Sequence, residues 1–127
     1  MVSRCNFILK IMKGAISKEV CQKRLKGIDD ALYAIGGKWR LKIIIALREG
    51  YTRFNEIQRT IGISAKMLSI ELKELELNGF LKREVHTGPP VVVEYKLTEY
   101  SDTLEGVLQA LSDWGENHRE KIRRERS

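Results

Sequence analysis

Cysteine and histidine are scarce in this chain of 127 residues, which holds two of each. Cys5 and Cys21 provide neither a disulfide framework nor a CxxC motif. His86 and His118 lie too far from them in the sequence to give the spacing of zinc ligands. We therefore predict no metal, no cofactor and a reduced, cytoplasmic setting.

Long apolar runs are also lacking. The apolar stretch 7–12 is interrupted by Lys10, and no small-residue cleavage site follows it. No segment approaches the roughly 18 apolar residues that a membrane span requires. The sequence therefore predicts neither export nor a membrane partner. We expect residues 1–16 to form a basic, flexible extension, and translation from Met12 instead of Met1 is an alternative.

The net charge of +6 is concentrated near the N-terminus. Residues 1–28 carry all of this excess, with Glu19 as their one acidic residue, and the rest of the chain is neutral. Bulk charge alone therefore does not identify a nucleic-acid surface. Between Arg53 and Lys73, however, basic groups outnumber acidic ones, and phosphate contact needs only a few well-placed cations. Solvated helix faces of random sign are the alternative.

Two helices are predicted before residue 50. Apolar residues recur at loose helical spacing from about Ser17 to Ile35, where Gly36 and Gly37 end the first helix. The second helix opens at Lys38 and ends by Gly50. Its segment 43–47 is apolar almost all round, which predicts a central buried helix, with a buried strand as the alternative.

A turn between two further helices follows. Thr52 is a candidate cap of a short helix whose apolar residues, at 54, 57 and 61, share one face. Gly62 then allows a tight turn into a helix over about 64–78, capped by Ser64 and ended by Gly79. The helical period buries one face of it, made by Leu68, Leu72 and Leu75. The opposite face presents Lys66, Ser69, Ile70 and Lys73.

After Gly79 the apolar period changes from helical spacing to two. Alternating runs on either side of the segment 86–90, which contains Gly88 and two prolines, predict a β-hairpin over about 80–98. A last helix is predicted over about 101–124. Its apolar stripe consists of Leu104, Val107, Leu108, Leu111 and Trp114. We expect this stripe to cover a partner subunit, and packing on its own domain is the alternative.

A helix, a turn, a second capped helix and a hairpin form the layout of a winged helix-turn-helix DNA reader. Lys66, Ser69, Ile70 and Lys73 are then candidates for groove contact, and the backbone N–H groups at Ser64 and Ala65 are candidates for phosphate binding. Arg53 is a candidate for binding a backbone phosphate. The predicted hairpin, which is the wing of this fold, offers four further candidates: Arg83, His86, Thr87 and Lys96.

The sequence resembles the HxlR family of bacterial winged helix-turn-helix regulators. The matching segments are IGGKW at 35–39, RFNEI at 53–57, ISAKML at 63–68, LKELE at 72–76, GFLKR at 79–83, PVVVEYKLT at 90–98 and WG at 114–115. The resemblance implies a homodimer formed by the first and last helices, which adds Leu25 and Ile28 to the interface candidates. It also implies an inverted-repeat operator whose successive major grooves receive the two recognition helices.

Some members of that family sense oxidants or electrophiles through a cysteine shortly before the Gly-Lys-Trp segment. Here Leu25 stands near the usual position, and Cys21 lies about one helical turn earlier. Gln22 follows it in place of the customary proline. Basic neighbours modestly favour the reactive thiolate of Cys21, so redox sensing by this residue is a hypothesis.

The sequence thus predicts a mainly α fold with a small β-hairpin, a winged helix-turn-helix over residues 17–127 with dimerisation helices at about 17–35 and 101–124. The predicted function is a non-enzymatic homodimer that binds double-stranded DNA at an inverted repeat. Its recognition helix would enter the major groove and its wing would contact the flanking backbone or minor groove. A protein-interaction module and a small redox enzyme using Cys21 are the rival hypotheses. The sequence identifies no small-molecule effector.

Overall fold

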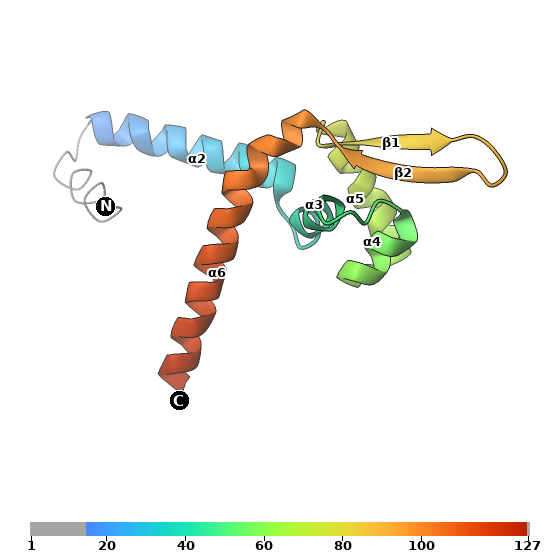
Figure 1. Ribbon diagram of the computed structural model, residues 1–127. Coiled ribbons are helices and arrows are strands. Elements are labelled where there is room, and N and C mark those ends of the chain that lie inside the picture. Colours follow the sequence, from blue (N-terminus) through green and yellow to red (C-terminus); the bar gives the residue numbers. More distant parts are fainter. Residues whose placement is uncertain (1–14, 127) are drawn as a thin grey trace. The chain divides into compact units, whose positions relative to one another are not determined.

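The structure is a computed structural model that describes residues 15–126, and it divides into two units, one ending at Gly37 and one beginning at Lys38 (Figure 1). The predicted flexible extension up to residue 14, the Met12 alternative and Cys5 lie outside the described residues. None of the described helices is both long enough and apolar enough to cross a bilayer.

The first unit is helix α2 (Ala15–Ile35), which begins two residues before the predicted start. Leu25, Ile28 and Leu32 recur at helical spacing and are all exposed. The helix ends at Gly36, whose N–H donates to the carbonyl oxygen of Leu32 at 2.8 Å. A Cβ atom at position 36 would lie 2.2 Å from that same oxygen, so only glycine fits this end of the helix.

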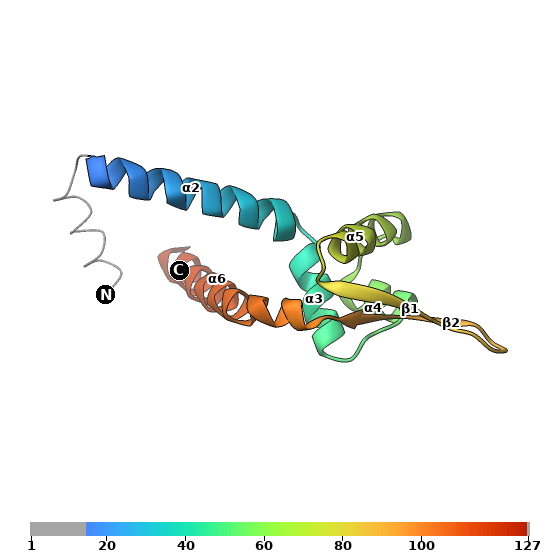
Figure 2. The same cartoon turned by 90° about the horizontal axis from the view of Figure 1, so that it is seen from above.

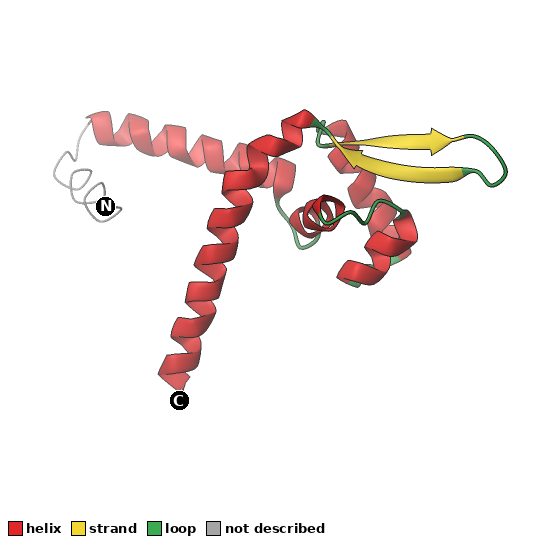
Figure 3. Ribbon diagram, viewed as in Figure 1, coloured by secondary structure: helices red, strands yellow, loops and turns green. Residues whose placement is uncertain are grey.

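The second unit is a winged helix with a long C-terminal helix, and it is mainly helical with one antiparallel hairpin (Figure 3). Its elements are α3 (Arg40–Arg48), α4 (Phe54–Ile61), α5 (Ala65–Leu77), β1 (Leu81–His86), β2 (Val92–Leu97), the 3-10 turn η1 (Glu99–Leu104) and α6 (Glu105–Arg126). The predicted fold class is confirmed. The core is formed by side chains of α3, α4, α5 and the first residues of the hairpin.

The segment 43–47 is helical, as predicted, and lies at the centre of this core. Ile43 and Ile44 are fully buried, whereas Ile45 is 48% exposed and interrupts the expected all-round burial. The helix starts at Arg40, two residues later than predicted. The guanidinium of Arg40 forms a half-buried ion pair of 2.7 Å with Glu71, which ties α3 to α5.

The predicted cap of α4 was wrong. Arg53, not Thr52, is the N-cap residue, and its backbone N–H donates to the Glu56 carboxylate at 3.2 Å. The Thr52 hydroxyl donates instead to the Glu94 carboxylate of β2, at 2.8 Å. The carbonyl oxygen of Thr52 also accepts from the N–H of Tyr95, again at 2.8 Å. Thr52 therefore belongs to the edge of the hairpin.

The ends and faces of α5 agree with the sequence prediction. The Ser64 hydroxyl caps the helix by accepting from the N–H of Met67 at 3.2 Å. Leu68, Leu72 and Leu75 are buried. Gly62 before the helix and Gly79 after it have φ angles of +74° and +84°, the left-handed region in which glycine is favoured.

The hairpin has two chemically different faces. The register pairs Leu81 with Leu97 and Arg83 with Tyr95, so these side chains share one face. On the other face Glu84 lies directly opposite Glu94, an arrangement of like charges that is destabilising by itself. His86 Nε2 lies 3.0 Å from Glu94 and 3.9 Å from Glu84, and Lys96 Nζ lies 3.4 Å from Glu84. Lys96 offsets the repulsion by its positive charge, and the imidazole N–H of His86 does so by donating to the carboxylates.

The pKa of the Glu94 carboxyl is held below its ordinary value. The hydrogen bond from Thr52 is the main cause, because it favours the charged carboxylate, and the positive charges of His86, Arg53 and Lys96 act in the same direction. Desolvation opposes this shift. The carboxylate that lies opposite Glu84 is thus kept ionised.

The last predicted helix begins later than expected, because residues 99–104 form a 3-10 turn. In that turn Ser101 is fully buried, and its hydroxyl donates to the Thr98 carbonyl at 2.6 Å. Arg48 of α3 fastens the junction by binding the Ser101 carbonyl at 3.2 Å and the Glu105 carboxylate at 2.7 Å. Beyond it α6 leaves the rest of the second unit as a single long helix (Figure 2).

We predict that Leu68→Ala lowers the free energy of unfolding by about 2–5 kcal/mol, because it removes a fully buried side chain and leaves a cavity. Urea denaturation of the purified chain measures the change. Ile70→Ala, two positions along the same helix, is the matched control and should change stability by less than about 0.5 kcal/mol, since Ile70 is exposed. Similar losses in both variants would contradict the assigned faces.

Replacing Thr52 by Val should raise the pKa of the Glu94 carboxyl toward its ordinary value, because the hydrogen bond that lowers it is lost. A lowered pKa in the folded state stabilises the fold above the ordinary pKa, and this contribution disappears as the pH falls through the lowered value. The variant should therefore lose less stability on acidification. NMR titration of the Glu94 side chain provides the measurement, with Thr60→Val, whose hydroxyl meets only a backbone carbonyl, as control.

Candidate nucleic-acid interface

The outward face of α5 is the centre of the candidate interface. Lys66, Ser69, Ile70 and Lys73 are all exposed, because the leucine positions of the same helix are buried in the core. Two lysines, a hydroxyl and an apolar side chain on one helix face can meet phosphates, base edges and thymine methyl groups. The structure therefore brings together the four candidates that the helical period predicted.

The N-terminal end of α5 adds fixed positive potential to this face. The helix has 13 residues and no acidic residue in its first turn. Its first N–H groups point toward the same end as Lys66, and the Ser64 hydroxyl satisfies the one at Met67. Backbone donors and the helix dipole at such an end favour a negatively charged group. Ser64 and Ala65 thus lie where a phosphate could approach.

Arg83 of the hairpin lies beside the outward face of α5. Together with Tyr95 it lines a surface hollow whose α5 side is made by Ser69, Leu72, Lys73 and Glu76. Arg83 stands on the hairpin face that carries Leu81 and Tyr95, and this face turns toward α5. Ser69, Lys73 and Arg83, which come from two elements, therefore form one continuous polar surface.

His86 and Lys96 are separated from this surface. Both stand on the opposite face of the hairpin, where they pair with Glu84 and Glu94. Thr87, at the tip, is exposed. The four wing candidates named from the sequence thus fall into three places: one beside α5, one at the tip and two in a charge-balanced cluster.

A second basic site lies at α4. Arg53, the N-cap residue, and Arg59, in the last turn, border a hollow whose other side is formed by the wing segment 90–93. Sequence reasoning named Arg53 and missed Arg59. The signal was present, because Arg59 lies on the face of the helix opposite Ile57 and Ile61 and is exposed.

The candidate dimer residues differ in exposure. Leu25 and Ile28 of α2 and Val107, Leu111 and Trp114 of α6 are exposed, and Trp114 stacks on His118 with ring centroids 4.9 Å apart. The predicted role of Leu104 in the dimer interface was wrong. Its side chain is only 8% exposed, because the 3-10 turn points it into its own domain. Leu108 is half-buried. The alternative of packing on the same domain therefore holds for the start of the stripe.

The described residues contain no group of three or more histidine, cysteine or acidic side chains arranged to hold a metal ion. Cys21, in α2, is a free and exposed thiol. The cluster of His86, Glu84 and Glu94 is a set of ion pairs on the hairpin.

Comparison with known proteins agrees with this geometry. Residues 34–123 match the HxlR-like helix-turn-helix family. The chain is 41% identical over 96 residues to the uncharacterized HTH-type transcriptional regulator YdeP of Bacillus subtilis, an alignment that covers 75% of each protein.

Two of the solved structures that match this chain are similar to it in both fold and sequence. The redox regulator HypR in its reduced form is 38% identical, with a TM-score of 0.70 over 76% of this chain and 97% of that one. The reduced form of the transcriptional regulator YodB from B. subtilis is 42% identical, with a TM-score of 0.63 over 69% and 87% of the two chains. The present chain therefore belongs to the HxlR-like helix-turn-helix family of transcriptional regulators.

Proposed function

We propose that two copies of this chain bind an inverted-repeat operator, with α5 of each copy in the major groove. The observation that carries this proposal is the outward face of α5, where Lys66, Ser69, Ile70 and Lys73 are exposed beside a helix end without acidic residues. A helix whose buried face anchors it in a rigid domain can present its other face to base edges.

Phosphate contacts would come from several elements around this helix. Arg83 borders α5, and Arg53 and Arg59 border the hollow beside the wing. Such contacts fix the position of a protein on the duplex and release counterions, so affinity should fall steeply with salt. Their positions, one beside α5 and two beside α4 and the wing, support a duplex that runs past both α4 and the hairpin.

The wing would contact DNA with its tip, where Thr87 is exposed, and with Arg83. We assign His86 and Lys96 a different role from the direct contact expected from the sequence. Both balance Glu84 and Glu94, and without them two adjacent carboxylates would face the polyanion. They would therefore act by keeping the wing compatible with DNA.

A homodimer is supported by the exposed apolar residues of α2 and α6. Leu25, Ile28, Leu111 and Trp114 are large side chains left in contact with solvent in the single chain. Closed two-fold pairing would cover them and would repeat the recognition helix in opposite orientation, which matches the symmetry of an inverted repeat.

Lys66→Ala should weaken binding to duplex fragments selected from genomic DNA by about tenfold or more, because each copy loses one cationic contact. A gel-shift titration at fixed salt measures the change. Lys121→Ala, which removes the same charge from α6, is the matched control and should bind like the unchanged protein. Unchanged binding of the Lys66 variant would remove this residue from the interface.

Leu111→Asp should convert the dimer to monomers and with it abolish operator binding, because a charge would be buried in the apolar pairing surface. Sedimentation at several protein concentrations measures the association. Asn117→Asp introduces the same charge at an exposed position on the polar side of α6, and it should leave the dimer intact. A stable Leu111→Asp dimer would exclude this part of α6 from the interface.

A further inference from the structure

The hollow between α4 and the wing has two walls of different chemistry. The wall on the α4 side is mainly polar and consists of Arg53, Phe54, Asn55, Glu56 and Arg59, and the opposite wall is the wing segment 90–93. The volume of the hollow is about 550 Å³, within the range of about 300–1,000 Å³ that is typical of small-molecule sites. A molecule lying in it would contact both walls at once.

The wing wall is apolar and open to solvent. It consists of Pro90 and three successive valines. Val91 is 64% exposed, Pro90 is also exposed, and the next two valines are half-buried. A phosphate group of DNA would gain nothing from covering these side chains, whereas a hydrocarbon body would remove them from water. The wing wall therefore favours an apolar ligand surface.

The α4 wall carries an excess of positive charge. Arg53 and Arg59 are both exposed, and Glu56 is the one acidic residue that lines the hollow with them. The Glu56 carboxylate already accepts from the backbone N–H of Arg53, at 3.2 Å. A guanidinium group presents paired N–H donors that match the two oxygens of a carboxylate. The α4 wall therefore favours an anionic headgroup.

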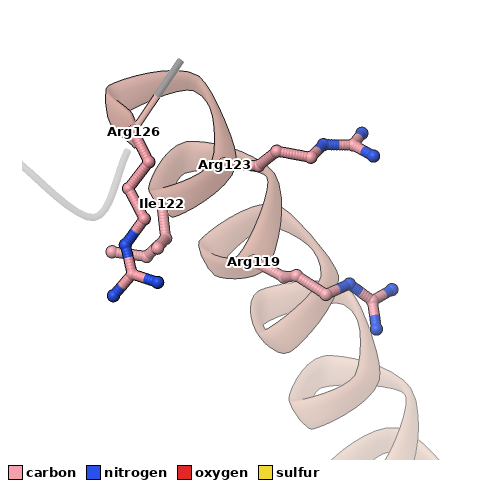
Figure 4. A pocket seen from close by; sticks show the side chains of 4 residues that line it. All are labelled: Arg119, Ile122, Arg123 and Arg126. Atoms are coloured by element: carbon pink, nitrogen blue, oxygen red, sulfur yellow. The ribbon is translucent and has the colours of Figure 1, made fainter.

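A second hollow lined by arginines lies on the last turns of α6. Among the described residues, only this helix lines it, with Arg119, Ile122, Arg123 and Arg126 (Figure 4). Figure 4 shows Arg119 and Arg123 extending in the same direction from successive turns. A ligand bound there would have its other side in solvent. The hollow between α4 and the wing is the better site, because its two walls come from different elements, and the α6 hollow provides a control.

We propose that the hollow between α4 and the wing binds a small carboxylic acid with an aromatic or branched hydrocarbon body. Its carboxylate would accept hydrogen bonds from Arg53 and Arg59, and its body would cover Val91 and Pro90. Such a ligand matches both walls, because small-molecule sites combine apolar lining with a few polar groups that fix the orientation of the ligand.

The ligand would weaken DNA binding, because Arg53 and Arg59 are also the proposed phosphate contacts. A guanidinium group that binds the carboxylate is no longer available to a phosphate. By linkage, a ligand that binds the DNA-free protein more tightly than the complex lowers the affinity for DNA by the same factor. This competition rests on the proposed function, whereas the ligand site itself does not.

An NMR titration of the isotopically labelled full-length protein with 1-naphthoate, without DNA, tests the site. We expect saturable shifts centred on the backbone amides of residues 53–59 and 91–93. The neutral analogue 1-naphthamide has the same body without the charge, and should bind about tenfold more weakly or less. Phenylbutyrate and ethylhexanoate extend the test to other hydrocarbon bodies. If none of the three acids gives saturable shifts at these residues, the proposal is overturned.

A first pair of variants tests the polar wall. Arg59→Gln should weaken the binding of 1-naphthoate by about tenfold, because the carboxylate loses one charged donor. Arg119→Gln removes the same charge from the α6 hollow and should bind 1-naphthoate like the unchanged protein. Equal losses in the two variants would mean that overall charge controls binding, and would overturn the assignment of the carboxylate to Arg59.

A second pair tests the apolar wall. Val91→Ser should weaken the binding of 1-naphthoate by about threefold or more, because less apolar surface is covered. Val85→Ser changes another exposed valine of the hairpin, which does not line the hollow, and should leave binding unchanged. An effect of Val85→Ser as large as that of Val91→Ser would overturn the placement of the ligand body.

A gel-shift titration with duplex fragments selected from genomic DNA, at fixed ionic strength, tests the competition. Saturating 1-naphthoate should raise the dissociation constant for the duplex by about threefold or more, and 1-naphthamide should not. An acid that binds the hollow and leaves this constant unchanged overturns the competition. A chain that binds no duplex overturns the proposed function and the competition with it, and the shifts in the DNA-free protein then still decide on the ligand site.

Discussion

The buried leucine face of α5 is the constraint on which the candidate interface depends. Leu68, Leu72 and Leu75 fix the rotation of the helix about its axis, and the half-buried pair of Arg40 and Glu71 fixes it against α3. Once that rotation is set, the helical period determines which side chains of α5 face outward. The residues of the candidate DNA-contacting surface are therefore determined by the hydrophobic core on the other side of the helix.

The charged side chains of the second unit are distributed unevenly over its surface. Exposed lysines and arginines lie on α5, on α4 and on the hairpin face that carries Arg83. The opposite face of the hairpin carries the carboxylates of Glu84 and Glu94 with His86 and Lys96 beside them. Farther along, α6 changes from acidic at its start to basic at its end. The small net charge of the unit hides this separation, which is why composition said little about where a polyanion would bind.

Local patterns predicted most of this architecture. Capping by Ser64, the glycine turns and the change from a helical period to alternation depend on neighbours in the sequence, and all three were predicted correctly. The errors came from distant partners. Thr52 did not cap α4 because Glu94, 42 residues away, accepts from its hydroxyl, and Leu104 turned inward because Ser101 and Arg48 hold a 3-10 turn there. No periodicity of α6 could reveal that junction.

The connection between Thr52 and β2 has a mechanical consequence. Two hydrogen bonds, one from the hydroxyl to Glu94 and one from the Tyr95 N–H to the carbonyl, clamp this residue to the hairpin, and Arg53 follows it in the chain. We therefore expect a displacement of β2 at these residues to be transmitted to Thr52 and to the start of α4. Bending of the hairpin on a duplex would then also change the position of Arg53.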